Sequence, residues 1–155
     1  MNKRFLISVV VLFIVSMVLG MVVHGMLLGA DYQKLTPNLF RGEQESQAHF
    51  GAMLLAHIFM AVGFTWVYRA GRKDRPWLGQ GVRFGIAVAV LATIPGYLIY
   101  YAVQPMPLDL VLKQIVFDTI AMIVMGIAAA AVNRDPLRAS SPQAGADEEL
   151  SPMPR

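Results

Sequence analysis

The sequence predicts an all-α integral membrane bundle of four transmembrane helices, with both termini in the cytoplasm. Three observations predict it: four long apolar runs, few charged residues, and basic residues gathered beside alternate ends of these runs. Only 15% of the residues are charged, whereas soluble domains average about 25%. About 20 apolar residues cross the roughly 30 Å hydrocarbon core of a bilayer. We therefore expect one transmembrane domain over residues 1–132, with spans at about 5–28, 47–68, 81–103 and 108–132.

The first apolar run follows Lys3 and Arg4, so a cleavable signal peptide is the alternative to a retained helix. The run is longer than the apolar region of a signal peptide, which has about 7–15 residues. Leu28, two positions before Ala30, is also not the small residue that a cleavage site needs. We therefore predict an uncleaved first membrane helix.

The longest connection between spans covers residues 29–46. Thr36 and Pro37 are typical of a helix start, because a hydroxyl can cap the first turn and proline fits the first helical position. Leu39 and Phe40 would then lie on the bilayer surface. We expect a short interfacial helix in this connection.

The third and fourth spans are joined by the short, uncharged turn 104–107, which predicts a tight antiparallel hairpin. Residues 133–155 are polar and rich in Pro, Ser, Ala and Glu. Such a segment cannot bury enough apolar surface to order itself, so we predict a disordered cytoplasmic tail.

The basic residues set the predicted orientation, because Lys and Arg favour the cytoplasmic ends of membrane spans. The side that carries both termini holds most of them: Lys3, Arg4, Arg69, Arg72, Lys73, Arg75, Arg83, Arg134 and Arg138. The other side holds Lys34 and Arg41, with Lys113 at its membrane border. We expect both termini in the cytoplasm and the 29–46 connection in the periplasm.

Composition excludes several classes of function. Cysteine is absent, which excludes disulfide frameworks, thiol redox relays and thiolate metal sites. The net charge of +3 and the pI near 9.5 could indicate nucleic-acid binding. The basic residues lie beside apolar runs, as membrane flanks do, so we expect no nucleic-acid partner.

Asp118 stands in the middle of the fourth apolar run. A carboxylate at that depth costs about 3 kcal/mol on insertion scales, so it must face protein or water rather than lipid. Helical spacing places Gln114 on the same face. His57, His24 and Tyr97, on the other three spans, fall in the outer half of the bilayer. We take these five residues as the candidate intramembrane polar site.

Three uses of this site compete with a purely structural one. A protonatable Asp118–His57 pair would suit a proton-linked carrier. His24 and His57 could ligate haem or, with the methionines on the same helical faces, Cu(I). A polar cluster over an apolar pocket could bind a lipid or quinone headgroup. The structural alternative is that Asp118 and His57 only hydrogen-bond across the bundle. Methionine at helical spacing is core more often than ligand, and no HxxH or HxxxH motif is present, so we predict no metal site and no cofactor.

Small residues recur at steps of three or four along the third span. Their spacing predicts one smooth ridge that lets another helix approach closely: Gly81, Gly85, Ala89, Ala92 and Gly96. Pro95 removes one backbone hydrogen bond, that to the carbonyl of Leu91, and predicts a kink. On the fourth span, Asp109 and Lys113 are four residues apart and are expected to pair.

Four stretches resemble a group of small bacterial inner-membrane proteins of unknown function: VVHGMLLGADY (22–32), MLLAHIFMA (53–61), RPWLGQGVRFG (75–85) and VLKQIVFDTI (111–120). The resemblance covers everything except the C-terminal tail. It implies a four-helix fold in the bacterial inner (cytoplasmic) membrane and supplies no activity.

No nucleophile–base pair or catalytic motif is visible, so we expect a protein that is not an enzyme. The expected function is a structural or accessory role in the membrane, ahead of small-solute or proton-linked transport through Asp118 and His57. Haem, metal, quinone or lipid binding is the next alternative. The expected partners are the lipid bilayer and either a second copy of the chain or another membrane protein.

Overall fold

The computed structural model describes residues 3–36, 38–73 and 76–134 and confirms the all-α class, because these residues form helices and turns and no strand. The helical segments in chain order are α1 (Lys3–Gly20), η1 (Met21–Leu27), α2 (Gly29–Leu35), α3 (Glu43–Ala48), α4 (Phe50–Gly71), α5 (Trp77–Val88), η2 (Ala89–Thr93), α6 (Ile94–Val103) and α7 (Leu108–Asn133). The two η segments are π-helices, in which each turn is wider than an α-helical turn.

Four continuous stretches are long and apolar enough to cross a membrane: Lys3–Leu27, Phe50–Gly71, Trp77–Val103 and Leu108–Asn133. They follow the four expected spans, with boundaries that differ by a few residues. The expected tail over residues 133–155 lies outside the described residues from position 135 onward. Its first residue, Asn133, is the last residue of α7.

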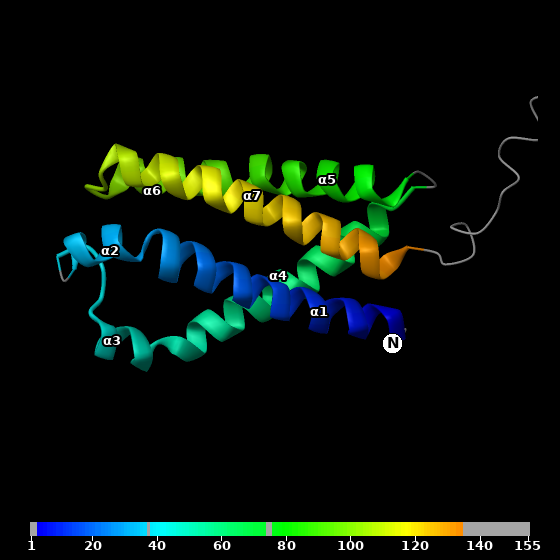
Figure 1. The fold of residues 1–155 in the computed structure, drawn as a ribbon, viewed down its shortest axis with the longest axis horizontal. Helices are drawn as coiled ribbons and strands as arrows, with labels where there is room; N and C mark the ends of the chain where they lie inside the picture. The colour runs from blue at the N-terminus through cyan, green and yellow to red at the C-terminus, as the bar shows by residue number, and fades with distance from the viewer. Residues whose placement is uncertain (1–2, 37, 74–75, 135–155) are drawn as a thin grey trace, which may run out of the picture.

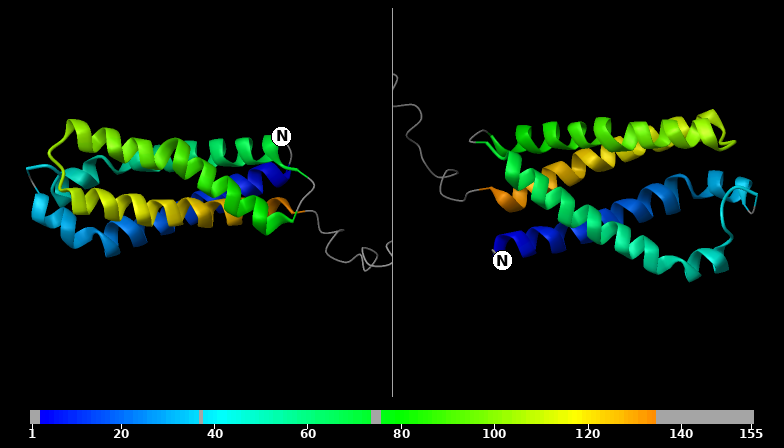
Figure 2. Two further views of the ribbon diagram at one scale, coloured as in Figure 1. Left: turned by 90° about the horizontal axis from the view of Figure 1, so that it is seen from above. Right: turned by 180° about the vertical axis from the view of Figure 1, so that it is seen from behind.

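The elements meet at two ends of the bundle (Figures 1 and 2). The start of α1, the end of α7 and the connection from α4 to α5 lie at one end, which we call the terminal end. The helices α2 and α3 and the turn from α6 to α7 lie at the opposite end, the loop end. Helices α5 and α6 run along α7, whereas α4 crosses α1 near the middle of the bundle. As a result, the first half of α4 diverges from η1 toward the loop end.

Glycines let α5 and α7 pack backbone against backbone. A Cβ atom added at Gly81 would lie 2.7 Å from the Gly126 carbonyl oxygen and 2.9 Å from Ala130 Cβ. One added at Gly85 would lie 2.5 Å from Ile123 Cα. Real Cβ atoms do not approach that closely, so only glycine fits at these two positions. The contact joins the third span to the fourth along the terminal half of the bundle.

The close contact ends where α5 passes into η2. Ala89 is buried, but Ala92 is exposed and a Cβ added at Gly96 would meet no atom within 4 Å. The wide turn of η2 lies directly before Pro95, which has no backbone N–H to donate to the preceding turn of this continuous helix. Because a π-turn carries an extra residue, it rotates the following helix and moves Ala92 and Gly96 out of line with Gly85.

The connection after η1 differs from the expected interfacial helix. Helix α2 begins at Gly29 and ends at Leu35, and Thr36 is extended, with φ −86° and ψ 140°. Residue 37 lies outside the described residues, but residues 38–40 form a turn and a bend, so the helix expected to start at Thr36 and Pro37 is absent from the described residues that follow. A residue before proline is driven out of the helical region, so Thr36 ends a helix instead of starting one. The next helix, α3, begins at Glu43.

Apolar residues of this connection pack on the bundle instead of lying free on the bilayer surface. Leu35, Leu39 and Phe40 contact a cluster of buried residues at the loop end: Val23, Leu28, Met106, Leu110 and Val111. Nearby, Lys113 Nζ lies 2.7 Å from Asp31 Oδ2, whereas the expected pair with Asp109 is longer, at 4.0 Å. The ion pair with Asp31 ties α2 to α7.

Asn133 joins three elements at the terminal end. Its side chain is buried, and its Nδ2 donates to Ser8 Oγ and to the Ala129 carbonyl oxygen, both at 2.9 Å. Arg69 Nη1 donates to Asn133 Oδ1 at 3.3 Å, and Arg72 donates to the Asn133 backbone carbonyl. The residue therefore holds the end of α7 against both α1 and α4.

Candidate functional site

Asp118 is the residue on which three of the four spans converge. Its side chain, on α7, is 13% exposed. The Tyr97 hydroxyl, on α6, donates a hydrogen bond to Asp118 Oδ2, and His24 Nε2, on η1, lies 3.4 Å from Asp118 Oδ1. An ionisable side chain within a membrane span needs partners of this kind, because lipid offers none.

His24 extends this contact toward the loop end. Its Nδ1 lies 2.7 Å from the Tyr32 hydroxyl of α2, and Gln114 Nε2 donates to the same hydroxyl oxygen at 3.1 Å. Because Tyr32 accepts from Gln114, its own proton is available to His24 Nδ1. Neutral His24 then carries its proton on Nε2, which lies 3.4 Å from Asp118 Oδ1, beyond normal hydrogen-bond length. Hydrogen bonds thus link Gln114, Tyr32 and His24, and His24 approaches the carboxylate without a hydrogen bond.

His57 has a separate partner. Its Nδ1 lies 3.0 Å from Ser16 Oγ, and Ser16 Oγ donates to the Phe13 carbonyl oxygen at 2.8 Å. Since the single Ser16 proton goes to Phe13, Ser16 must accept from His57 Nδ1–H. Neutral His57 therefore presents the lone pair of Nε2 as a hydrogen-bond acceptor. The ring rests against Gly20, where an added Cβ would lie 3.3 Å from His57 Cε1.

His57 and Asp118 share a cavity of about 840 Å³ that α1, η1, α4 and α7 line where α4 diverges from η1. We call it the Asp118 cavity. Its polar lining comes from Ser16, His24, His57 and Asp118. Six of the ten methionines form much of the wall: Met17, Met21, Met53, Met60, Met122 and Met125. The cavity thus combines a flexible apolar wall with a small set of polar groups.

The structure brings four of the five candidate residues into one chain of polar contacts and places the fifth elsewhere on the same cavity. Asp118, Tyr97 and His24 are in contact, and Gln114 joins them through Tyr32. Within the described part of the chain, His57 bonds to Ser16 and makes no direct hydrogen bond with Asp118.

Two members of the site, Ser16 and Tyr32, were not among the residues predicted from the sequence. Ser16 is one of the few polar residues in the first span. Its position two turns before His24 could have predicted that it belongs to the site. Tyr32 lies outside the spans and reaches His24 only because the chain turns at Leu28 between η1 and α2. Burial raises the pKa of Tyr32, helped by the charge of Asp118 and opposed by the Gln114 hydrogen bond. Tyr32 therefore stays protonated at neutral pH.

No group of three or more His, Asp or Glu side chains that could hold a metal ion occurs in the ranges that the structure describes. The carboxylate and the two imidazoles of the cavity are suited instead to hydrogen bonding with a ligand. His24 lies beside Asp118, His57 offers an acceptor, and both groups face apolar walls. The arrangement can orient a polar headgroup while apolar atoms fill the remaining space.

Fold and site together define a small four-span protein, helical throughout its described residues, with a polar group of side chains beside an apolar cavity. The chain belongs to the family described as "Protein of unknown function (DUF1761)", whose model matches residues 7–130. This match confirms the resemblance to a membrane-protein family of unknown function. No curated protein and no solved structure matches the chain.

Proposed function

We propose that this chain is a non-enzymatic accessory protein of a bacterial inner membrane that binds a lipid-soluble amphiphile in the Asp118 cavity. In this proposal both termini face the cytoplasm, as the basic residues of the terminal end suggest. The observation that carries the proposal is the cavity itself, which joins an acceptor-rich polar group to a methionine-lined wall.

The size and the wall of the cavity support an amphiphilic ligand. Small-molecule sites in proteins have volumes of about 300–1,000 Å³, mostly apolar walls and a few placed polar groups. The Asp118 cavity, at about 840 Å³, lies within this range. Methionine side chains are flexible and polarisable, so they adapt to apolar groups of different shape. A wall built from six of them suits an alkyl or isoprenoid chain.

The polar groups favour a headgroup that donates hydrogen bonds. Neutral His57 offers the Nε2 lone pair, and the Asp118 carboxylate accepts on both oxygens. A hydroxyl-bearing head, such as that of a hydroquinone or a long-chain alcohol, complements both groups. A quinone head carries only acceptors and leaves them unpaired, which is costly in an apolar site.

A second candidate, proton-linked transport of a small solute, is favoured by one observation. The Tyr32–His24 hydrogen bond and the 3.4 Å approach of His24 to Asp118 form a chain of polar contacts from the loop end to the cavity. Proton relays in membrane proteins are built from such chains of ionisable side chains. In liposomes, transport predicts a pH-gradient-driven flux that Asp118→Asn abolishes. A pure binding protein shows no such flux.

The binding proposal is tested by thermal unfolding of the purified protein in detergent, under anaerobic conditions, with three probes that share a decyl chain. Decyl-hydroquinone is expected to raise Tm most, since a ligand that binds only the folded state stabilises it. The corresponding decyl-quinone should raise Tm less, and decane least. Equal shifts with all three probes would contradict the proposed headgroup recognition.

Two methionine variants show whether the probe occupies the cavity. Met53→Trp places an indole in the cavity and should remove most of the Tm shift caused by decyl-hydroquinone. Met26→Trp is the matched control, because Met26 is 72% exposed and outside the cavity lining. An undiminished shift in a folded Met53→Trp protein would place the probe elsewhere and overturn the proposal.

A further inference from the structure

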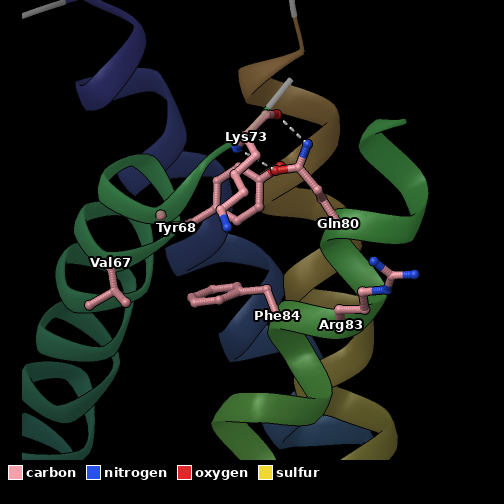
Figure 3. Close-up of a pocket in the computed structure, with 7 residues that line it drawn as sticks. Val67, Tyr68, Lys73, Gln80, Arg83 and Phe84 are labelled. Carbon is pink, nitrogen blue, oxygen red and sulfur yellow. Dashed lines mark hydrogen bonds between the residues drawn. The ribbon is translucent and has the colours of Figure 1, made fainter. Parts of the chain in front are cut away.

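The terminal end of the bundle holds a second cavity, of about 300 Å³, between α4 and α5. Figure 3 shows the side chains around it. Apolar and aromatic groups form its floor, from Val67, Tyr68 and Phe84, and the Tyr68 and Phe84 rings pack edge to face with centroids 5.4 Å apart. Two cationic residues, Lys73 and Arg83, complete the arrangement. We call this site the α4–α5 groove.

Lys73 is fixed in place through its backbone. Its N–H donates to Gln80 Oε1 at 2.9 Å, and Gln80 Nε2 donates to its carbonyl oxygen at 2.6 Å (Figure 3). These two hydrogen bonds clamp the chain after α4 against the first turn of α5. The side chains of Lys73 and Tyr68 both line the groove.

Arg83 is exposed on α5, six residues after the first residue of that helix, Trp77. At about 1.5 Å of rise per residue, this places Arg83 about 9 Å along the third span. Figure 3 shows its side chain directed away from α4. A charged side chain that faces lipid at this depth must reach back to the headgroup layer or find an anionic partner. Neither Arg83 nor Lys73 forms an ion pair with an acidic residue in the described ranges.

Among the described residues, the terminal end carries a strong positive charge, whereas at the loop end Lys34, Arg41 and Lys113 nearly balance the carboxylates. The described basic residues of the terminal end are Lys3, Arg4, Arg69, Arg72, Lys73, Arg83 and Arg134. The described acidic residues lie at the loop end or in the middle of α7: Asp31, Glu43, Glu45, Asp109 and Asp118. Charge complementarity therefore favours an anion at the groove.

We propose that the α4–α5 groove binds one anionic phospholipid of the surrounding leaflet. The phosphodiester lies beside Lys73, the Arg83 side chain turns toward it from the far side of α5 on binding, and one acyl chain covers the apolar floor formed by Val67 and Phe84. A phospholipid fits because it brings an anion to the membrane surface together with an alkyl chain that reaches the apolar floor. This site is independent of the Asp118 cavity and of the ligand proposed there.

Tryptophan fluorescence provides the test, because the only two tryptophans of the chain flank the groove. Trp66 precedes Val67 on α4, and Trp77 begins α5; they are 68% and 37% exposed. The whole protein is reconstituted in mixed vesicles that contain brominated phosphatidylglycerol or, in parallel, phosphatidylcholine with the same brominated chains. Stronger quenching by the anionic lipid reports its preference for the groove.

Each cation near a membrane surface changes the affinity for anionic lipid about fivefold. Lys73→Gln should therefore reduce the preference for phosphatidylglycerol about fivefold, and the Lys73→Gln/Arg83→Gln double variant should abolish it. Lys3→Gln is the matched control, since it removes one cation from the same end outside the groove. We expect Lys3→Gln to leave the preference within twofold of the wild-type value.

Three results would overturn the proposal. A wild-type protein that does not distinguish the two lipids has no such site. Equal losses in Lys3→Gln and Lys73→Gln would show diffuse attraction to the whole terminal end. Reversal of the preference by inorganic phosphate, at constant ionic strength, would show a site for free anions. In each case the lipid preference is compared with that of the double variant, whose two substitutions lie outside the Asp118 cavity.

Discussion

The close contact between α5 and α7 predicts opposite effects for the same substitution at two glycines of one span. In Gly85→Ala, the new Cβ would lie 2.5 Å from Ile123 Cα and 2.9 Å from Ile123 N. Both atoms belong to backbone and cannot rotate away. In Gly96→Ala, the new Cβ would meet no atom within 4 Å. Comparing the two variants therefore separates the loss of stability caused by the close contact from the gain in helix propensity that alanine brings.

The magnitudes follow from the geometry. Apolar atoms are most stable about 3.5–4.0 Å apart, so Gly85→Ala forces α5 and α7 apart by about 1 Å or distorts both. Overpacking of this kind costs about 1–3 kcal/mol. Alanine offsets up to about 1 kcal/mol through its better helix propensity. We expect Gly85→Ala to lower the free energy of unfolding by about 1–2 kcal/mol, and Gly96→Ala to leave it unchanged or raise it.

The assay is unfolding of the purified protein by sodium dodecyl sulfate in mixed micelles, followed by circular dichroism. Helix loss should begin at a lower detergent fraction for Gly85→Ala than for wild type, and at the same or a higher fraction for Gly96→Ala. Gly81→Ala should behave like Gly85→Ala, because its Cβ would lie 2.7 Å from the Gly126 carbonyl oxygen. Equal stability of Gly85→Ala and Gly96→Ala would refute the packing argument.

Three further predictions use the same purified protein or its fusions. Asn133→Ala removes one hydrogen bond each from the buried Ser8 hydroxyl and the half-buried Arg69 side chain and should cost about 1–3 kcal/mol; stability equal to wild type would contradict the role of Asn133. Lys113 and Lys34 hold the pKa of Asp31 below the usual value for an aspartate, so its stabilisation is present above that usual pKa and lost as pH falls through the lowered value. The difference in Tm between wild type and Asp31→Asn should thus shrink from pH 7 to pH 3, and a constant difference would contradict the ion pair. Alkaline phosphatase fused after Gln44 should be active, and fused after residue 138 inactive; the reverse would overturn the orientation.

The helical faces that the sequence predicted are the ones that surround the cavity. Counting about 100° per residue puts Met53, His57 and Met60 on one face of the second span, and all three line the Asp118 cavity. Asp118 had to face inward because lipid offers a carboxylate no partner, and the structure places it among Tyr97 and His24. Rules based on helical period and on the cost of charge in lipid were sufficient for these positions.

Departures from regular α-helix account for what the sequence did not predict. The wide turn of η2 rotates the helix after Ala89, so the small residues beyond it leave the contact with α7. The turn between η1 and α2 brings Tyr32 back to His24, and no periodicity of a single helix predicts that contact. His57 lies on the expected face, but Ser16 hydrogen-bonds to its ring, because α4 crosses α1 there. Crossing points and wide turns depend on three-dimensional packing rather than on local spacing.

The central claim is that the Asp118 cavity presents His57 Nε2 as an acceptor for a hydroxyl-bearing headgroup, and nitrogen-15 NMR of the three histidines tests it directly. At a pH where His57 is neutral, we predict a proton on Nδ1 and none on Nε2. Decyl-hydroquinone should then shift the Nε2 resonance of His57 while leaving that of His49, on the exposed loop surface, unchanged. A proton on His57 Nε2, or a resonance that decyl-hydroquinone does not move, would contradict the account.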